Sequence, residues 1–98
     1  MERLYCITRK DLTPGQKTAQ ACHAATQYIL DNPKTNWDNG FIICLEIDSE
    51  QELLKLKESL DIKGLNYSYF KEPDMGDALT AISMLDHGKT FANLKLLR

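Results

Sequence analysis

The chain has 98 residues, of which 43% are hydrophobic and 27% charged, and its net charge is −2; these values are typical of one soluble globular domain over residues 1–98. No apolar run approaches the roughly 20 residues of a membrane-spanning helix, and the start MERLYCITRK is unlike a signal peptide, so we expect a cytoplasmic protein with no membrane partner. The small acidic surplus also argues against a broad nucleic-acid-binding surface.

The first half of the chain predicts a strand, a helix and a second strand. Leu4–Thr8 and Phe41–Leu45 are short, almost continuous apolar runs, typical of strands buried on both faces of a largely parallel sheet. Between them lie one helical pattern, which we place at Pro14–Leu30, and the polar, turn-rich residues 31–40. Together these segments predict a β-α-β unit.

The second half predicts another helix and two more strands. Ser49 and Glu52 have the spacing of a capping box ahead of helically spaced leucines, and Gly64 suits a helix end. The later elements are expected to be strands at Tyr67–Phe70 and Leu79–Met84, a short helix at His87–Leu94 and an apolar end at Leu94–Leu97. The predicted fold class is α/β, a three-layer α/β/α sandwich with a four-stranded mixed sheet and about three helices.

The helix at Pro14–Leu30 carries a line of polar side chains on one side. Thr13 is a good N-cap, and Pro14 suits the first helical position. At about 100° per residue, four polar side chains fall within about 60° of one another: Gln16, Gln20, His23 and Gln27. The opposite side is expected to pack on the sheet: Thr18, Ala21, Cys22, Ala25, Tyr28 and Ile29. The pattern therefore predicts an imidazole and three amides directed away from the sheet, with Lys17 about a quarter-turn aside.

Two interpretations of this polar line stay open. It is either a solvated outer face or a functional surface. Solvated faces more often carry Glu and Lys in i,i+4 pairs, whereas no acid occurs from Gln16 to Leu30. The absence of acids favours a functional surface.

The start of the same helix predicts an anion site. It follows a strand and so opens at the carboxyl edge of the sheet, where free N–H groups and the positive end of the helix dipole suit a phosphate or an oxyanion. Gly15 allows close approach to the backbone, and Arg9, Lys10 and Lys17 give the N-terminal segment a surplus of positive charge. Plain helix capping is the other role open to Gly15 and Gln16.

The cysteines and histidines predict neither a disulfide nor a metal site. Cys6, Cys22 and Cys44 lie in apolar segments without CxxC spacing, and their odd number favours reduced, buried thiols. His23 and His87 lie far apart in the sequence, with no paired ligands near either. We therefore expect no metal and no other cofactor.

The residues around the first helix resemble the signature of the type 2 peptidyl-tRNA hydrolases. The resemblance rests on the run Arg9–Leu12, then Gly15, then Ala19–Ala25, whose sequence AQACHAA matches the family pattern A-Q-x-x-H-A-A. It extends through Trp37, the second strand, the segment SEQELLKL and the end Leu94–Leu97, and so covers nearly the whole chain.

This resemblance implies a metal-independent hydrolase of translation that cleaves the ester between a peptide and the 3′ ribose of tRNA. By position, Gln20 and His23 match family site residues directly, and Asp11 matches the aspartate at the strand end. The family's catalytic lysine falls on Gln16, and Lys17 is the next residue. A site aspartate in the loop after the third strand falls on Glu72.

Ester hydrolysis needs a base for water and a donor for the carbonyl oxyanion. We assign His23 as the base, oriented by Glu72 or Asp74. Lys17, or the Gln16 and Gln20 amides with backbone N–H groups, would hold the oxyanion. The predicted catalytic residues are Asp11, Lys17, Gln20, His23 and Glu72, and the predicted ligand-binding residues are Arg9, Lys10, Gly15, Gln16, Gln27, Asp74 and Thr80.

A non-catalytic binding protein on the same scaffold is the second hypothesis. It would sequester a nucleotide or a nucleotide-derived signalling molecule at the helix start and the loop EPDMGD. Gln16 at the family's lysine position and the acidic balance of the chain favour this hypothesis. Pro73 and Gly76 also allow the loop to be a simple turn. The expected partner is therefore tRNA or a nucleotide-type ligand, and the family resemblance further implies a homodimer.

Overall fold

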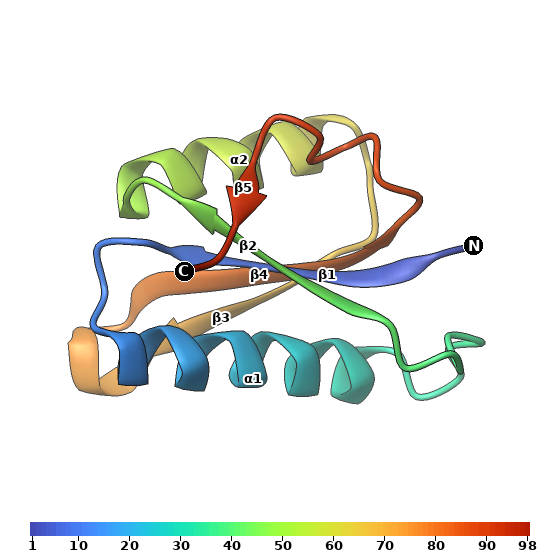
Figure 1. The fold of residues 1–98 in the computed structure, drawn as a ribbon, viewed down its shortest axis with the longest axis horizontal. Helices are drawn as coiled ribbons and strands as arrows, with labels where there is room; N and C mark the ends of the chain where they lie inside the picture. Colours follow the sequence, from blue (N-terminus) through green and yellow to red (C-terminus); the bar gives the residue numbers. More distant parts are fainter.

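A computed structural model describes all residues, 1–98, as one five-stranded mixed sheet with a helix on each face (Figure 1). The sheet order is β3-β4-β1-β2-β5. The elements along the chain are β1 Arg3–Arg9, α1 Pro14–Asp31, β2 Ile42–Ile47, α2 Glu50–Ile62, β3 Ser68–Glu72, the 3₁₀ turn η1 Pro73–Met75, β4 Ala78–Asp86 and β5 Lys95–Leu96. The α/β class is confirmed, and the strand number is corrected from four to five.

The predicted β-α-β unit is confirmed. β1 and β2 are parallel, with Leu4 opposite Ile42, and α1 connects them. α1 begins at a complete capping box, in which Thr13 and Gln16 each bind the other's backbone N–H. β4 runs antiparallel to both β1 and β3, so β3 runs in the same direction as β1. The carboxyl ends of β1, β2 and β3 consequently meet at one edge of the sheet.

The predicted helix at His87–Leu94 is wrong. This segment consists of bends and turns, and it leads into the short fifth strand β5. The Asp86 carboxylate accepts hydrogen bonds from the backbone N–H of Gly88 and from both the N–H and the hydroxyl of Thr90. An aspartate that captures nearby N–H groups in this way stabilises a turn in competition with a helix.

The core has two layers, one on each face of the sheet. The cluster under α1 consists of Leu4, Cys6, Ala24, Tyr28 and Ala81. The larger cluster under α2 consists of Tyr5, Ile7, Leu45, Leu53, Leu60, Leu79, Ile82, Met84 and Phe91. Alternate residues of β1 thus face opposite helices, as the side-chain alternation of a strand requires. No helix of the structure has the length and apolar character needed to cross a bilayer.

An irregularity in β4 changes which side chains face α1. The β3–β4 register shifts between Phe70 and Lys71, where β4 contributes one extra residue. Ala81 packs in the cluster under α1, and the Thr80 hydroxyl also bonds to α1. Two consecutive side chains of one strand therefore point toward the same helix.

The predicted orientation of α1 is wrong by about a quarter-turn. The buried residues of α1 are Gln20, Ala21, Ala24 and Tyr28, whereas Thr18, Cys22 and Ile29 are exposed. The expectation that all three cysteines are buried is wrong for Cys22 in the same way. Ala24 brings α1 close to the sheet, and that close approach encloses Gln20 at the flank of the contact. The polar line therefore runs alongside β3 instead of facing away from the sheet.

Candidate functional site

The candidate site lies where the carboxyl ends of β1 and β3 meet the first turns of α1. β1 ends at Arg9, β3 ends at Glu72, and α1 begins at Pro14. In Figure 1 these three ends lie together at the same end of the molecule. In open α/β sheets, ligands usually bind outside the carboxyl ends of the strands.

Gln20 is the buried centre of this site. Its side chain is only 2% exposed. Its Nε2 donates to Glu72 Oε1 at 2.9 Å, and its Oε1 accepts from the Thr80 hydroxyl at 2.5 Å. Two partners on different strands therefore fix the orientation of the amide. The Thr8 hydroxyl stabilises the position of Thr80 by donating a hydrogen bond to its carbonyl oxygen at 2.7 Å.

His23 lies one helical turn beyond Gln20 and stacks on Phe70. The two rings are nearly parallel, at 11°, with centroids 4.2 Å apart. Phe70 and Glu72 are two residues apart on β3, so they support His23 and Gln20 in two adjacent rows. His23 remains exposed. Stacking covers one ring face and leaves the nitrogens at the ring edge available for proton exchange.

Arg9 and Asp11 form a two-point ion pair at the end of β1. Arg9 Nε and Nη2 donate to the two carboxylate oxygens of Asp11, each at 3.0 Å, and Nη1 donates to the Leu79 carbonyl at 3.4 Å. The hydrogen bond from Arg9 holds the pKa of Asp11 below its ordinary value, and the same bond raises the pKa of Arg9. Both groups therefore stay charged while neutralising each other. The pair ties the β1–α1 loop to the start of β4, next to Thr80.

The first turn of α1 uses Gln16 as a cap. Gln16 Oε1 accepts from the backbone N–H of Thr13 at 3.0 Å. The capping interpretation of Gln16 is therefore confirmed. Gly15 is exposed, with no atom within 4 Å of the position that a Cβ would occupy. A ligand can consequently approach the backbone closely at this residue.

We call Gln20, His23, Glu72 and Thr80 the Gln20 cluster. Four predicted site residues lie outside it. Lys17 Nζ donates to the backbone carbonyl of Arg98 at 2.8 Å, and Lys10 pairs with Asp48 at 3.1 Å. Gln27 donates to Asp31 at 2.8 Å, and Asp74 lies exposed in the turn η1. Of the residues assigned to the site from sequence, the structure thus brings together Gln20, His23, Glu72 and Thr80, with the Arg9–Asp11 pair beside them.

Sequence reasoning missed two supporting residues. The sequence pattern places Phe70 in a strand and gives it no role at the site, but in the structure the Phe70 ring is the surface on which His23 stacks. Glu50, in the first turn of α2, accepts a hydrogen bond from the Leu79 N–H at 2.9 Å and so fixes the start of β4. No spacing in the sequence relates either residue to α1. No group of three or more His, Cys, Asp and Glu side chains is placed to hold a metal ion.

Comparison with known proteins identifies relatives of the chain. Residues 3–84 match the family described as Peptidyl-tRNA hydrolase PTH2. No curated protein matches the sequence. Among solved structures, the protein of unknown function Atu0240 from Agrobacterium tumefaciens strain C58 has the same fold, with a TM-score of 0.71 and 13% identity over 99% of this chain and 98% of that one. The predicted family resemblance is confirmed.

Proposed function

This chain belongs to the Peptidyl-tRNA hydrolase PTH2 family, and on that basis we propose that it hydrolyses the ester bond of peptidyl-tRNA or of another N-blocked aminoacyl-tRNA. Membership supports the reaction class and tRNA as the partner. The residues that carry out the reaction, and the absence of a metal from it, are part of the proposal.

The observation that supports the proposal most is the arrangement of Gln20, His23 and Glu72 on facing elements. The buried amide of Gln20 holds the Glu72 carboxylate in place, and His23 lies one turn away with its ring edge free. An imidazole supported on an aromatic ring, one helical turn from an amide that fixes a carboxylate, is compatible with general base catalysis.

In the proposed reaction His23 is the general base. It takes a proton from water as the water oxygen bonds to the ester carbonyl carbon, and the carbonyl oxygen becomes an oxyanion. The oxyanion then re-forms the carbonyl as the bond to the ribose 3′ oxygen breaks, and the imidazolium returns the proton to that oxygen. The products are a free peptide acid and a tRNA 3′ hydroxyl. Glu72 stabilises the imidazolium while it exists.

In this proposal, the oxyanion is bound by uncharged hydrogen-bond donors. Gln20 Nε2 has a second N–H besides the one directed to Glu72. The N–H groups at the start of α1, around Gly15, add the positive end of the helix dipole. Asp11 acts as a positioning residue through its pair with Arg9. Lys10, Gln27 and Asp74 are assigned no part in the chemistry, because each lies outside the Gln20 cluster.

One observation weighs against catalysis and so supports a second candidate function, in which the chain binds a nucleotide-type ligand without cleaving it. The Lys17 ammonium bonds to the Arg98 carbonyl, and Gln16 occupies the family's lysine position and caps the helix. The Gln20 cluster therefore contains no cation. A missing donor of this kind typically costs a catalyst several kcal/mol.

Incubation of the purified chain with N-acetylated aminoacyl-tRNA separates the two candidates. Release of the N-acetyl amino acid above the non-enzymatic background supports hydrolysis. No release at micromolar protein, together with a thermal shift produced by nucleotides but not by tRNA, supports the binding function and dismisses the hydrolase.

A further inference from the structure

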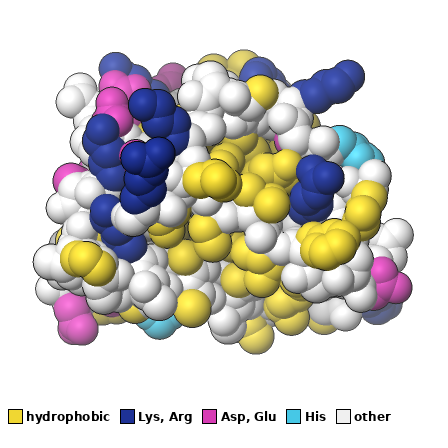
Figure 2. All heavy atoms as spheres, in the orientation of Figure 1, with side chains coloured by type: hydrophobic (Ala, Val, Ile, Leu, Met, Phe, Trp, Pro, Cys, Tyr) yellow, Lys and Arg dark blue, Asp and Glu magenta, His cyan; other side chains and the backbone are white.

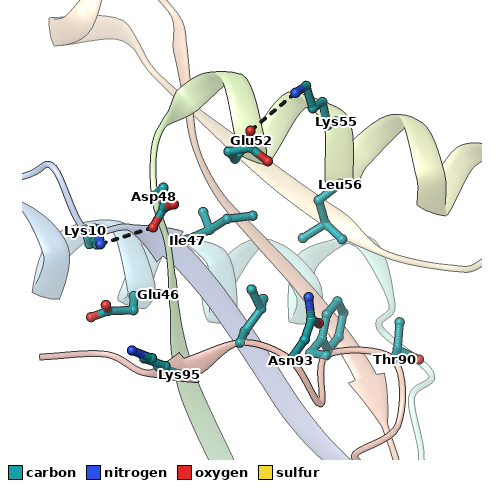
Figure 3. Close-up of a pocket in the computed structure, with 12 residues that line it drawn as sticks. Lys10, Glu46, Ile47, Asp48, Glu52, Lys55, Leu56, Thr90, Asn93 and Lys95 are labelled. Carbon is teal, nitrogen blue, oxygen red and sulfur yellow. Dashed lines mark hydrogen bonds and ion pairs between the residues drawn. The ribbon is translucent and has the colours of Figure 1, made fainter.

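A cavity lies at the β5 edge of the sheet, the edge opposite β3. It has a volume of about 490 Å³, is open to solvent on one side, and is bordered by the end of β2, the first turns of α2 and the segment leading into β5 (Figure 3). This volume is within the range of sites that bind small molecules, roughly 300–1,000 Å³. Gln20 and His23 face β3 and do not line it.

The floor of this cavity is apolar and rigid. Ile47, Leu56, Phe91 and Leu94 line it, and all four belong to or pack against the core under α2. Phe91 is only 3% exposed and packs on Tyr5, so it underlies the floor, whereas Ile47, Leu56 and Leu94 stay half-buried and present apolar surface to the cavity. A ligand with an apolar part can therefore bury that part against a preformed surface.

The rim of the cavity carries equal numbers of both charges. The charged lining residues are Lys10, Lys55, Lys95, Glu46, Asp48 and Glu52. Figure 2 shows acidic side chains lying among Lys and Arg side chains at one end of the molecular surface that it draws. A balanced lining disfavours a polyanion such as a nucleotide phosphate, because the acids repel it. It favours a ligand with one charge of each sign.

One carboxylate and one ammonium on the rim form no ion pair with each other. The other two pairs form ion pairs at 3.1 and 3.3 Å. Glu46 and Lys95 are directly opposite in the β2–β5 register, and Figure 3 shows both side chains at the same mouth of the cavity with no ion pair between them. A zwitterionic ligand can bind here, with its ammonium on the Glu46 carboxylate and its carboxylate on the Lys95 ammonium.

We propose that this cavity binds an apolar dipeptide with free ends. The dipeptide ammonium binds Glu46, its carboxylate binds Lys95, and its side chains cover Leu56 and Leu94, which are half-buried. Asn93 lines the same cavity, and its amide can pair with the peptide group of the ligand. This proposal does not depend on the proposed ester hydrolysis.

Calorimetric titration with the dipeptide Leu-Leu tests the proposal on the unmodified chain. We expect saturable binding, weakened about tenfold or more when the peptide is N-acetylated and by a similar factor when it is amidated, because each change removes one charged contact. AMP is titrated in parallel. Absence of Leu-Leu binding at millimolar peptide, tighter binding of AMP, or indifference to both blocked ends would overturn the proposal.

Two single-charge variants locate the binding. Glu46→Gln should weaken Leu-Leu about tenfold and make N-acetylation harmless, and Lys95→Gln should do the same for amidation. Lys63→Gln is the matched control, since Lys63 is exposed beyond α2 and does not line the cavity. Equal affinities for all three variants would place the peptide elsewhere and overturn the assignment.

Discussion

The Gln20 amide donates a 2.9 Å hydrogen bond to the Glu72 carboxylate, which joins two residues 52 positions apart in the chain. Thr80, 60 positions from Gln20, completes the set by donating to the other end of the same amide. The strand β4, with its extra residue at Thr80, is what allows this contact. The Gln20 amide is thus one of the polar contacts that join α1 to the sheet, together with the hydrogen bond that the Ser83 hydroxyl donates to the Ala24 carbonyl.

Replacing Gln20 with alanine should lower the free energy of unfolding by about 1–3 kcal/mol, because it removes the hydrogen bonds to the Glu72 carboxylate and to the Thr80 hydroxyl, which keeps only its 3.3 Å bond to the Phe70 carbonyl. Denaturant unfolding monitored by circular dichroism measures this change. Gln51→Ala is the control, since Gln51 is exposed on α2. Equal stability of the two variants would contradict the role given to Gln20.

Replacing Lys17 with alanine should leave ester hydrolysis within about threefold of the unmodified chain, a change in activation free energy below about 1 kcal/mol. The Lys17 ammonium bonds to the Arg98 carbonyl and does not contact the Gln20 cluster. Rates of release from N-acetylated aminoacyl-tRNA provide the measurement. A hundredfold loss would mean that the ammonium leaves Arg98 and serves as the oxyanion donor.

Replacing Asp86 with asparagine should destabilise the chain by about 1–3 kcal/mol at neutral pH, because three hydrogen bonds to a charged acceptor become weaker. Partial burial alone would raise the pKa of Asp86, but the hydrogen bonds from Thr90 and Gly88 hold it below the ordinary value of 3.8.

Because folding lowers this pKa, the stabilisation by Asp86 is fully present above about pH 4 and disappears as the pH falls through the folded-state value. The difference between the unmodified chain and Asp86→Asn should therefore shrink in acid. Thermal unfolding at a series of pH values measures it. A difference that grows on acidification would contradict the assignment of these hydrogen bonds to the carboxylate.

Much of the fold could be predicted from local signals. The apolar runs of β1 and β2, the capping box at Thr13 and the cap at Ser49 act within a few residues and place their elements correctly. The prediction for the segment after β4 was wrong, because its helical pattern competes with the hydrogen bonds that Asp86 accepts from the N–H groups of Gly88 and Thr90. The fifth strand has only two residues, too few to produce a periodic pattern.

The site could be predicted in its residues but not in its geometry. Gln20, His23 and Glu72 were identified from motif positions, and the structure brings them together. The predicted direction of the polar line was wrong. Helical periodicity cannot distinguish an exposed glutamine from a glutamine that is buried with hydrogen-bond partners on strands. The partners Thr80 and Phe70 lie on β4 and β3, and their proximity depends on strand pairing and on the irregularity in β4.

The proposed role of His23 as the base in ester hydrolysis is tested by comparing two variants in the cleavage of N-acetylated aminoacyl-tRNA. They are His23→Ala and His87→Ala, the same substitution at an exposed histidine next to the end of β4. We expect His23→Ala to lose about a hundredfold or more in rate, as for removal of a general base, and His87→Ala to cleave as fast as the unmodified chain. Equal rates for the two variants would contradict this role.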